Sequence, residues 1–150
     1  MAMSLEIDPR TAKVVQFYEH MTPSSLTELP GIYAEQATFK DPVNEVRGLP
    51  AIHTVFSHMF ETLTRPRFVV LNTMTQGDEA WITWNFLIQR PQGEWSIHGA
   101  THLRYAEDGR IKQHRDYWDP AQELYARLPI LGPLVRWLTR RLSASASSSN

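Results

Sequence analysis

The chain has no cysteine among its 150 residues. This absence excludes disulfide bonds, thiolate metal sites and cysteine nucleophiles together. An excess of charge of either sign is absent as well, because 15 Lys and Arg side chains stand against 16 Asp and Glu side chains. A balanced chain has no global field that would attract a polyanion. We therefore expect no nucleic-acid partner.

Long apolar runs are also missing. The start MAMSLEIDPR lacks the basic residues and apolar stretch of a signal peptide, and no segment reaches the ~18 apolar residues that a membrane span needs. These features predict a soluble, cytoplasmic protein. The length is typical of one domain, which we place at residues 1–142, with a C-terminal helical extension from about residue 120. The serine-rich residues 143–150 are expected to be a disordered tail.

The spacing of apolar residues predicts helices in the first half of the chain. The first spans about Arg10–Met21 and carries Tyr18 on its buried stripe. The clearest helix is entered through Gly48 and Pro50, and Phe56 lies on its apolar face. Between them, a short helix carries Leu26, Leu29, Ile32 and Tyr33.

The end of the chain is expected to return to helix. Asp119 reads as an N-cap before a first-turn proline, so a helix begins there and pauses at Leu128-Pro129. After Gly132-Pro133 the segment LVRWLTRRL has an apolar side and three arginines. This segment caps the domain, packs on a partner chain, or rests on an anionic membrane as a peripheral contact.

Between these helices the hydrophobic period changes to two from Phe68 onward. Turn signals at Gly77-Asp78, Gln92-Gly93 and Asp108-Gly109 then divide the segment into four antiparallel strands. Two-residue hairpins at these turns give the pairs Thr73–Ile82, Leu71–Trp84, Phe86–Gly99, Trp84–Thr101, Thr101–Asp116 and Leu103–His114.

This register gives the sheet one mostly apolar face and one mixed face. The mixed face carries Trp81, His102 and Tyr117 and suits a symmetric partner, so we expect a homodimer through it. A β-bulge would reverse the assignment of faces beyond it. The fold class is therefore α+β, with helices packed on a curved, mainly antiparallel sheet.

Ionisable side chains interrupt the apolar face. His114, Asp116 and Trp118 alternate on one strand and point the same way. A buried carboxylate without partners costs several kcal/mol, so Asp116 is hydrogen-bonded, protonated or turned toward a wet cavity. A purely structural contact between His114 and Asp116, or a salt bridge to an arginine, is an equal alternative. Asp41 precedes a proline, where an aspartate more often shapes a turn than acts as a base.

Several motifs are absent from the chain. It has no glycine-rich phosphate loop, no G-x-S-x-G and no zinc motif. We therefore expect neither a cofactor nor a metal.

Three segments together carry a resemblance to a known superfamily. VVQFYEHM, IYAEQATFKDPVNEVRGLPAI and the late HRDYWD resemble the nuclear transport factor two-like superfamily, in particular ketosteroid isomerases and SnoaL-like polyketide cyclases. The resemblance implies a cone-shaped α+β barrel. It also implies that Tyr18 donates to an oxyanion, that Asp41 shuttles a proton and that Trp118 forms an aromatic wall. In this chain Thr101 occupies the position of the second acid of the isomerases. Asp116 is predicted opposite Thr101 on the neighbouring strand, from which it could supply that acid.

Two functions fit this resemblance. The first is a cofactor-independent isomerase, cyclase or dehydratase that moves a proton next to a carbonyl. The alternative is a non-catalytic module that binds a lipophilic ligand or supports a dimer. Either uses a pocket for a small hydrophobic molecule. The catalytic candidates are Tyr18, Asp41, His114 and Asp116, and the substrate-binding candidates are Phe56, Trp84, Phe86, Thr101 and Trp118.

Overall fold

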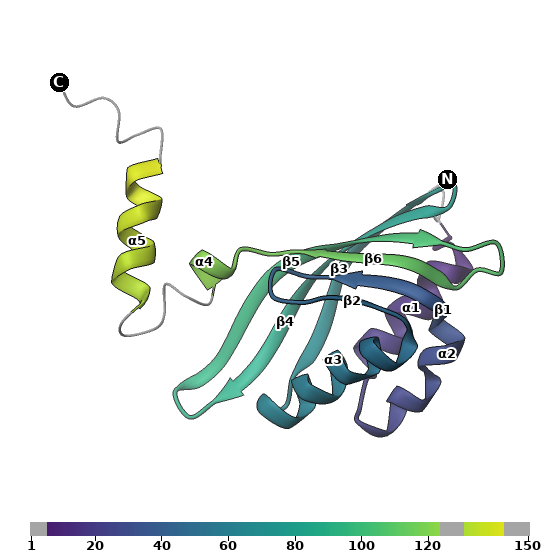
Figure 1. The fold of residues 1–150 in the computed structure, drawn as a ribbon, viewed down its shortest axis with the longest axis horizontal. Coiled ribbons are helices and arrows are strands. Elements are labelled where there is room, and N and C mark those ends of the chain that lie inside the picture. The colour runs from purple at the N-terminus through teal and green to yellow at the C-terminus, as the bar shows by residue number, and fades with distance from the viewer. Residues whose placement is uncertain (1–5, 124–130, 143–150) are drawn as a thin grey trace, which may run out of the picture. The chain divides into compact units, whose positions relative to one another are not determined.

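The computed structural model describes residues 6–123 and 131–142 (Figure 1). The chain forms two compact units, residues 1–117 and 118–150. The first unit holds the predicted helices and sheet. The second holds the C-terminal helices that we expected as an extension from about residue 120. The tail expected at residues 143–150 lies outside the described residues.

Four helices belong to the first unit: α1 (Pro9–Glu19), the 3-10 helix η1 (Ser24–Glu28), α2 (Leu29–Ile32) and α3 (Leu49–Thr62). Helix α1 begins where the Asp8 side chain accepts from the backbone N–H of Arg10 at 2.9 Å, with Pro9 in the first turn. It buries Val14 and Phe17, which confirms the predicted helix and its inner stripe. Helix α3 follows Gly48, as expected from its Gly and Pro entry, and buries Phe56.

The sheet has six strands, β1 (Tyr33–Lys40), β2 (Glu45–Arg47), β3 (Arg67–Gln76), β4 (Glu79–Arg90), β5 (Gly93–Tyr105) and β6 (Ile111–Tyr117). Their order is β2-β1-β6-β5-β4-β3. All neighbours are antiparallel except β1 and β6, which run parallel. The four strands expected after Phe68 are β3 to β6. The placement of Tyr33 in the short helix was wrong, because α2 ends at Ile32 and Tyr33 opens β1.

The predicted register is correct at both ends of this run of strands. Thr73 pairs with Ile82, Thr101 with Asp116, and Leu103 with His114. Between β4 and β5 the register differs by two residues, because the strands close at Arg90 and Gly93. Trp84 therefore pairs with Gly99, Ile82 with Thr101 and Phe86 with Ile97. A shift of two residues keeps every side chain on its predicted face.

The pairing of Leu71 with Trp84 was wrong because of an irregularity in β3. The register shifts between Val70 and Asn72, so Val70 pairs with Trp84 and Leu71 is left exposed. One extra residue reverses the alternation of side chains on one side of the irregularity. Val70 and Phe68 thus take the inner positions.

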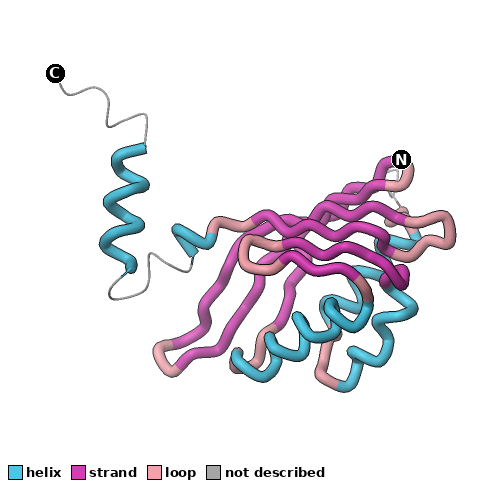
Figure 2. Tube along the Cα trace, in the orientation of Figure 1, coloured by secondary structure: helices cyan, strands magenta, loops and turns pink. Residues whose placement is uncertain are grey.

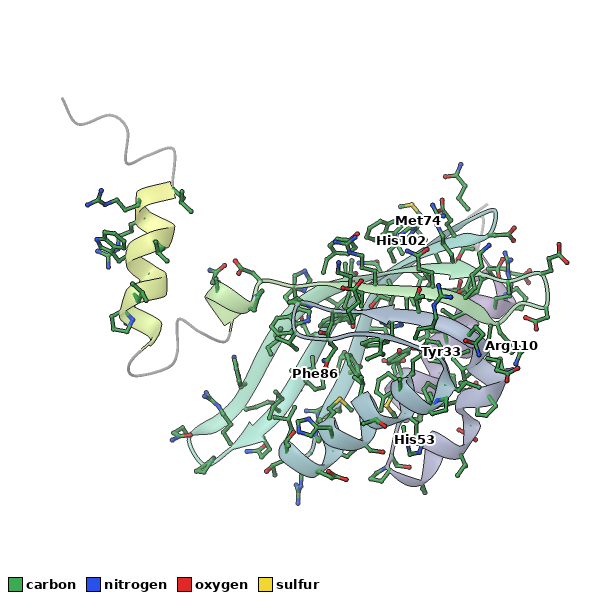
Figure 3. The ribbon with its side chains drawn as sticks, viewed as in Figure 1. Tyr33, His53, Met74, Phe86, His102 and Arg110 are labelled. Carbon is green, nitrogen blue, oxygen red and sulfur yellow. The ribbon has the colours of Figure 1, made fainter. Side chains whose placement is uncertain are left out.

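The helices of the first unit lie on one face of the curved sheet, and the opposite face carries none of them (Figures 1 and 2). Figure 3 shows Tyr33 and Phe86 on the helix side of the sheet and Met74 and His102 on the other side. The uncovered outer face carries the stacked rings of Trp81 and His102, 4.5 Å apart, beside Tyr117. These residues were assigned to the outer face from the sequence, and the homodimer expected there stays a prediction.

The second unit contains α4 (Pro120–Glu123) and α5 (Leu131–Leu142). The Asp119 carboxylate accepts from the backbone N–H groups of Ala121 and Gln122, so its predicted role as a cap is confirmed. Among the described residues, no helix is long and apolar enough to cross a membrane.

Candidate active site

A narrow apolar cavity lies between α1 and the inner face of the sheet. The space inside it is about 20 Å³, enough for about one water molecule, and the figure rises to about 340 Å³ only when the gaps between atoms and the open space at its mouth are counted. Most of its wall is aliphatic or aromatic, and the polar groups come from α1, β5 and β6. The lining residues are Val14, Val15, Tyr18, Phe68, Val70, Ile82, Trp84, Thr101 and Asp116.

Asp116 is the carboxylate of this cavity. Its side chain keeps 13% of its surface exposed, whereas the neighbouring His114 keeps 1%. The Asp116 Oδ1 atom accepts from the Thr101 hydroxyl at 2.5 Å and lies 2.7 Å from His114 Nε2. Thr101 Oγ1 accepts in turn from Trp84 Nε1 at 2.8 Å. The carboxylate is thus held by two side-chain partners on a single oxygen.

His114 lies behind the cavity wall and joins Asp116 to a pair of tyrosines. Its ring stacks on Phe39, with centroids 4.4 Å apart. Its Nδ1 atom is 2.9 Å from the Tyr33 hydroxyl and 3.2 Å from the Tyr18 hydroxyl, and the two hydroxyls are hydrogen-bonded to each other. We call these six hydrogen-bonded residues, Tyr18, Tyr33, Trp84, Thr101, His114 and Asp116, the polar cluster.

The two tyrosines of the polar cluster remain protonated at neutral pH. Burial raises the pKa of Tyr18 well above its ordinary value, and the neighbouring Tyr33 and Asp116 raise it further. Burial also raises the pKa of Tyr33, and this effect outweighs the opposing hydrogen bond from Tyr18. Both hydroxyls are therefore hydrogen-bond donors across the physiological range.

Gly99 makes room for the Trp84 indole that frames the cluster. The two residues face each other across β4 and β5. A Cβ atom at Gly99 would lie 2.7 Å from Cζ2 and 2.9 Å from Cζ3 of Trp84, and it would also contact Cη2. Such separations are well inside the 3.5–4.0 Å at which carbon atoms pack. The absent side chain at position 99 thus lets the indole lie flat over the strand and reach Thr101.

The structure brings most of the predicted site residues together. Tyr18, Trp84, Thr101 and Asp116 line the cavity, and His114 contacts two of them from behind.

Asp41 lies elsewhere, in the turn between β1 and β2. Its carboxylate accepts from the backbone N–H groups of Val43 and Asn44 at 2.7 and 2.5 Å, and from the Asn44 amide. Asp41 is not among the residues that line the cavity. Its expected role as a proton shuttle stays a prediction.

Phe56 and Phe86, which were also predicted to bind substrate, do not line the cavity. Phe56 is buried and packs edge-on against Tyr18, at 6.0 Å between centroids. Phe86 stacks on Phe68, which in turn contacts Trp84. Both therefore stand behind residues of the cavity wall. Trp118 begins the second unit, and its role as an aromatic wall stays a prediction.

The sequence analysis missed Tyr33, which was assigned to a helix. A usable signal was the apolar pattern of YAEQATF, in which Tyr33, Ala37 and Phe39 are the buried positions of an extended segment. Within the described residues, no group of three or more His, Cys, Asp or Glu side chains is placed to hold a metal ion.

Comparison with known proteins identifies the family. Residues 14–114 match the family model of the SnoaL-like domain. The chain belongs to the SnoaL-like domain family. Its fold is that of the nuclear transport factor two-like superfamily, so the predicted family and fold class are confirmed. A comparison with curated protein sequences found no match.

Solved structures of SnoaL-like and nuclear transport factor two-like proteins share this fold. One is a nuclear transport factor two-like protein of unknown function from Burkholderia pseudomallei K96243, with TM-score 0.67, 14% identity, and coverage of 77% of this chain and 95% of that chain. Another is an inferred SnoaL-like polyketide cyclase from Jannaschia sp. CCS1, with TM-score 0.64, 15% identity, and coverage of 76% and 90%. TerC, co-crystallised with polyporic acid, has TM-score 0.66, 13% identity, and coverage of 77% and 95%.

Proposed function

We propose that this protein is an acid–base enzyme that moves a proton next to a carbonyl group of a small, largely apolar molecule, as an isomerase, cyclase or dehydratase. The observation that supports it best is that Asp116 and Tyr18 both line one apolar cavity and are joined through His114. A base and a hydrogen-bond donor in the wall of an apolar cavity are what enolate chemistry needs. The co-crystallisation of TerC with an organic acid also favours a small-molecule ligand for this fold.

In this proposal Asp116 is the catalytic base. Its carboxylate takes a proton from the carbon beside the carbonyl, and the C–H electron pair moves to form the enolate. The same proton then returns to another carbon, which completes an isomerisation. In a cyclase the enolate carbon attacks the carbon of a second carbonyl of the substrate, the C=O π electrons move to its oxygen, and the resulting alkoxide takes the proton held by Asp116. In a dehydratase the enolate expels a β-hydroxyl group, which leaves as water with the proton held by Asp116.

Tyr18 is the donor to the enolate oxygen, and His114 is a positioning residue. With the Nε2 proton of His114 donated to Asp116, the Nδ1 atom accepts from the Tyr33 hydroxyl. The Tyr18 hydroxyl turns its proton from this pair to the enolate oxygen when the substrate is bound. His114 thus orients the base directly and the donor through Tyr33.

The test does not require the natural substrate. Cyclohexenone and tetralone, two apolar ketones, are incubated with the protein in deuterium oxide, and exchange of the protons next to the carbonyl is followed by NMR. We expect enzyme-dependent exchange, which falls by about 10² to 10⁴ in Asp116→Asn because a positioned base contributes a factor of that size. Asp108→Asn is the matched control, since it removes an exposed carboxylate in the turn between β5 and β6. Equal rates of deuterium exchange in the wild type and Asp116→Asn would refute the proposal.

A binding module is the second candidate, and one observation favours it. The Asp116 Oδ1 atom already has two partners, and His114 is fully buried, so the polar cluster could serve only to hold the cavity in shape. In that case the ketones bind, as seen by NMR line broadening, but no exchange is catalysed. Binding should then weaken in Trp84→Ala and remain in Asp116→Asn.

A further inference from the structure

Helix α5 presents an apolar face that the described residues of its own unit leave exposed. Leu134 is 53% exposed, Trp137 49% and Leu138 46%, and Leu142 at the end of the helix is more exposed still. At about 100° per residue, Leu134, Leu138 and Leu142 follow one another along one side, and Trp137 lies next to Leu134. Side chains of this size are rarely left in water as a group unless the surface contacts something apolar.

The charges of α5 are all of one sign. The segment Leu131–Leu142 carries Arg136, Arg140 and Arg141 and no acidic residue. Arg136 and Arg140 fall on the side away from the leucines. Arg141 lies beside the apolar residues, with its guanidinium carbon 4.8 Å from the centre of the Trp137 ring. The rest of the chain has 15 − 3 = 12 Lys and Arg against 16 Asp and Glu, a net charge of 12 − 16 = −4, so α5 is a cationic segment of an otherwise acidic chain.

We propose that α5 binds the surface of an anionic phospholipid bilayer, with Leu134, Leu138 and Leu142 in the acyl boundary and the arginines at the headgroups. An apolar face flanked by arginines and a tryptophan is the pattern of helices that lie in the membrane interface. Twelve residues make a helix of about 18 Å, which is shorter than the ~30 Å hydrocarbon core. The helix therefore lies along the surface. Arg141 reaches the headgroups from the apolar side by extending its long side chain.

The charge complementarity favours a bilayer over a second protein chain. An anionic surface attracts each nearby arginine with a free energy that corresponds to roughly a fivefold gain in affinity. Arg140 and Arg141 together would give roughly 30-fold. A partner protein would need a matching acidic groove, whereas an anionic bilayer offers phosphate and carboxylate groups everywhere along the helix. Binding to the bilayer should therefore weaken as salt is raised.

The experiment is sedimentation of the full chain with vesicles. One set contains phosphatidylcholine and phosphatidylserine in equal parts, and the other contains phosphatidylcholine alone. We expect pelleting with the first set and at least about tenfold weaker binding to the second. Leu138→Glu should weaken binding to the anionic vesicles by about tenfold or more, because it places a charge where the leucine would enter the acyl boundary.

The control is Val43→Glu, which makes the same kind of change at an exposed apolar residue of the β1–β2 turn. It should bind like the wild type. Should Leu138→Glu fold poorly by circular dichroism, the double variant Arg140→Gln and Arg141→Gln should still bind roughly 30-fold more weakly. Failure of the wild type to pellet, or equal pelleting of wild type and α5 variants, would overturn the proposal. So would a loss of self-association in Leu138→Glu measured without vesicles, since α5 would then pack on a second copy.

Discussion

The close approach of Trp84 to the backbone of Gly99 makes a sharp prediction about Gly99→Ala. In a strand, alanine normally stabilises relative to glycine by about 0.5–1 kcal/mol. Here the new methyl group would overlap the Trp84 ring at Cζ2, Cζ3 and Cη2. The indole must move, and the backbone on which it rests cannot yield easily, because Gly99 is paired to β4 and the adjoining Ala100 is paired to Tyr117 of β6.

The expected magnitude has two parts. Overpacking of a buried site costs about 1–3 kcal/mol. Displacement of the indole also breaks the 2.8 Å hydrogen bond from Trp84 Nε1 to Thr101, which leaves a buried donor unpaired at about 1–3 kcal/mol. We expect Gly99→Ala to lower the free energy of unfolding by roughly 2–5 kcal/mol, or the melting temperature by about 5–15 °C in a chain of this size.

Urea denaturation followed by circular dichroism measures this loss, and the indole N–H signal of Trp84 in a nitrogen-15 spectrum reports the broken hydrogen bond. Gly31→Ala is the matched control, because a Cβ atom there meets only the tip of Lys13 at 3.9 Å. In a double-mutant cycle, Trp84→Phe should cost much less in the Gly99→Ala background than in the wild type, since the smaller ring relieves the overlap. If Gly99→Ala is as stable as the wild type and its Trp84 signal is unmoved, the reasoning is wrong.

Two further predictions concern the tyrosine pair and the outer face. Above pH 10 the unfolded chain releases its tyrosine protons while Tyr18 and Tyr33 keep theirs, so the free energy of unfolding should fall with rising pH by about 1.4 kcal/mol per pH unit for each. Tyr33→Phe should remove one such contribution from the slope, as urea titrations between pH 9 and 11 can check, and an unchanged slope would contradict the assignment. For the outer face, where Trp81 is 43% exposed and Met74 69%, we predict a homodimer that Trp81→Glu converts to monomer in sedimentation velocity, while Val43→Glu leaves it intact. A wild type that sediments as a monomer would refute the dimer.

Much of the polar cluster could be predicted because a clear turn signal in the sequence sets the register of the last hairpin. The Asp108-Gly109 turn places Thr101 opposite Asp116 and Leu103 opposite His114, and the structure has both pairs. The register of this hairpin shifts between Arg104 and Tyr105, next to the turn. The predicted pairing of Thr101 with Asp116, which lies farther from the turn, is still correct. The helices were predicted because their apolar faces repeat at a regular spacing.

What could not be predicted depends on irregular backbone and distant partners. Nothing in the local pattern shows that β3 shifts register between Val70 and Asn72, and this shift exchanged Leu71 for Val70 in the cavity wall. Tyr33 was missed because its partner His114 is 81 residues away, and the helical spacing of the preceding leucines continues into it. The Asp-Pro pair at Asp41 was interpreted from the sequence as a turn more often than a base, and the structure has the turn, whereas the proton-shuttle role that the resemblance implied stays a prediction.

The parallel pairing of β1 with β6 has a consequence for how the chain folds. These strands come from opposite ends of the first unit, and their contacts close a loop of about eighty residues, as the bond from Tyr33 to His114 does. Contacts of such long separation slow folding, because chain entropy is lost before they form. On the ribosome, the N-terminal helices and β1 emerge long before their partner strand exists. The site is thus assembled last, and a chain that stops short of β6 has neither its central strand nor the carboxylate of its cavity.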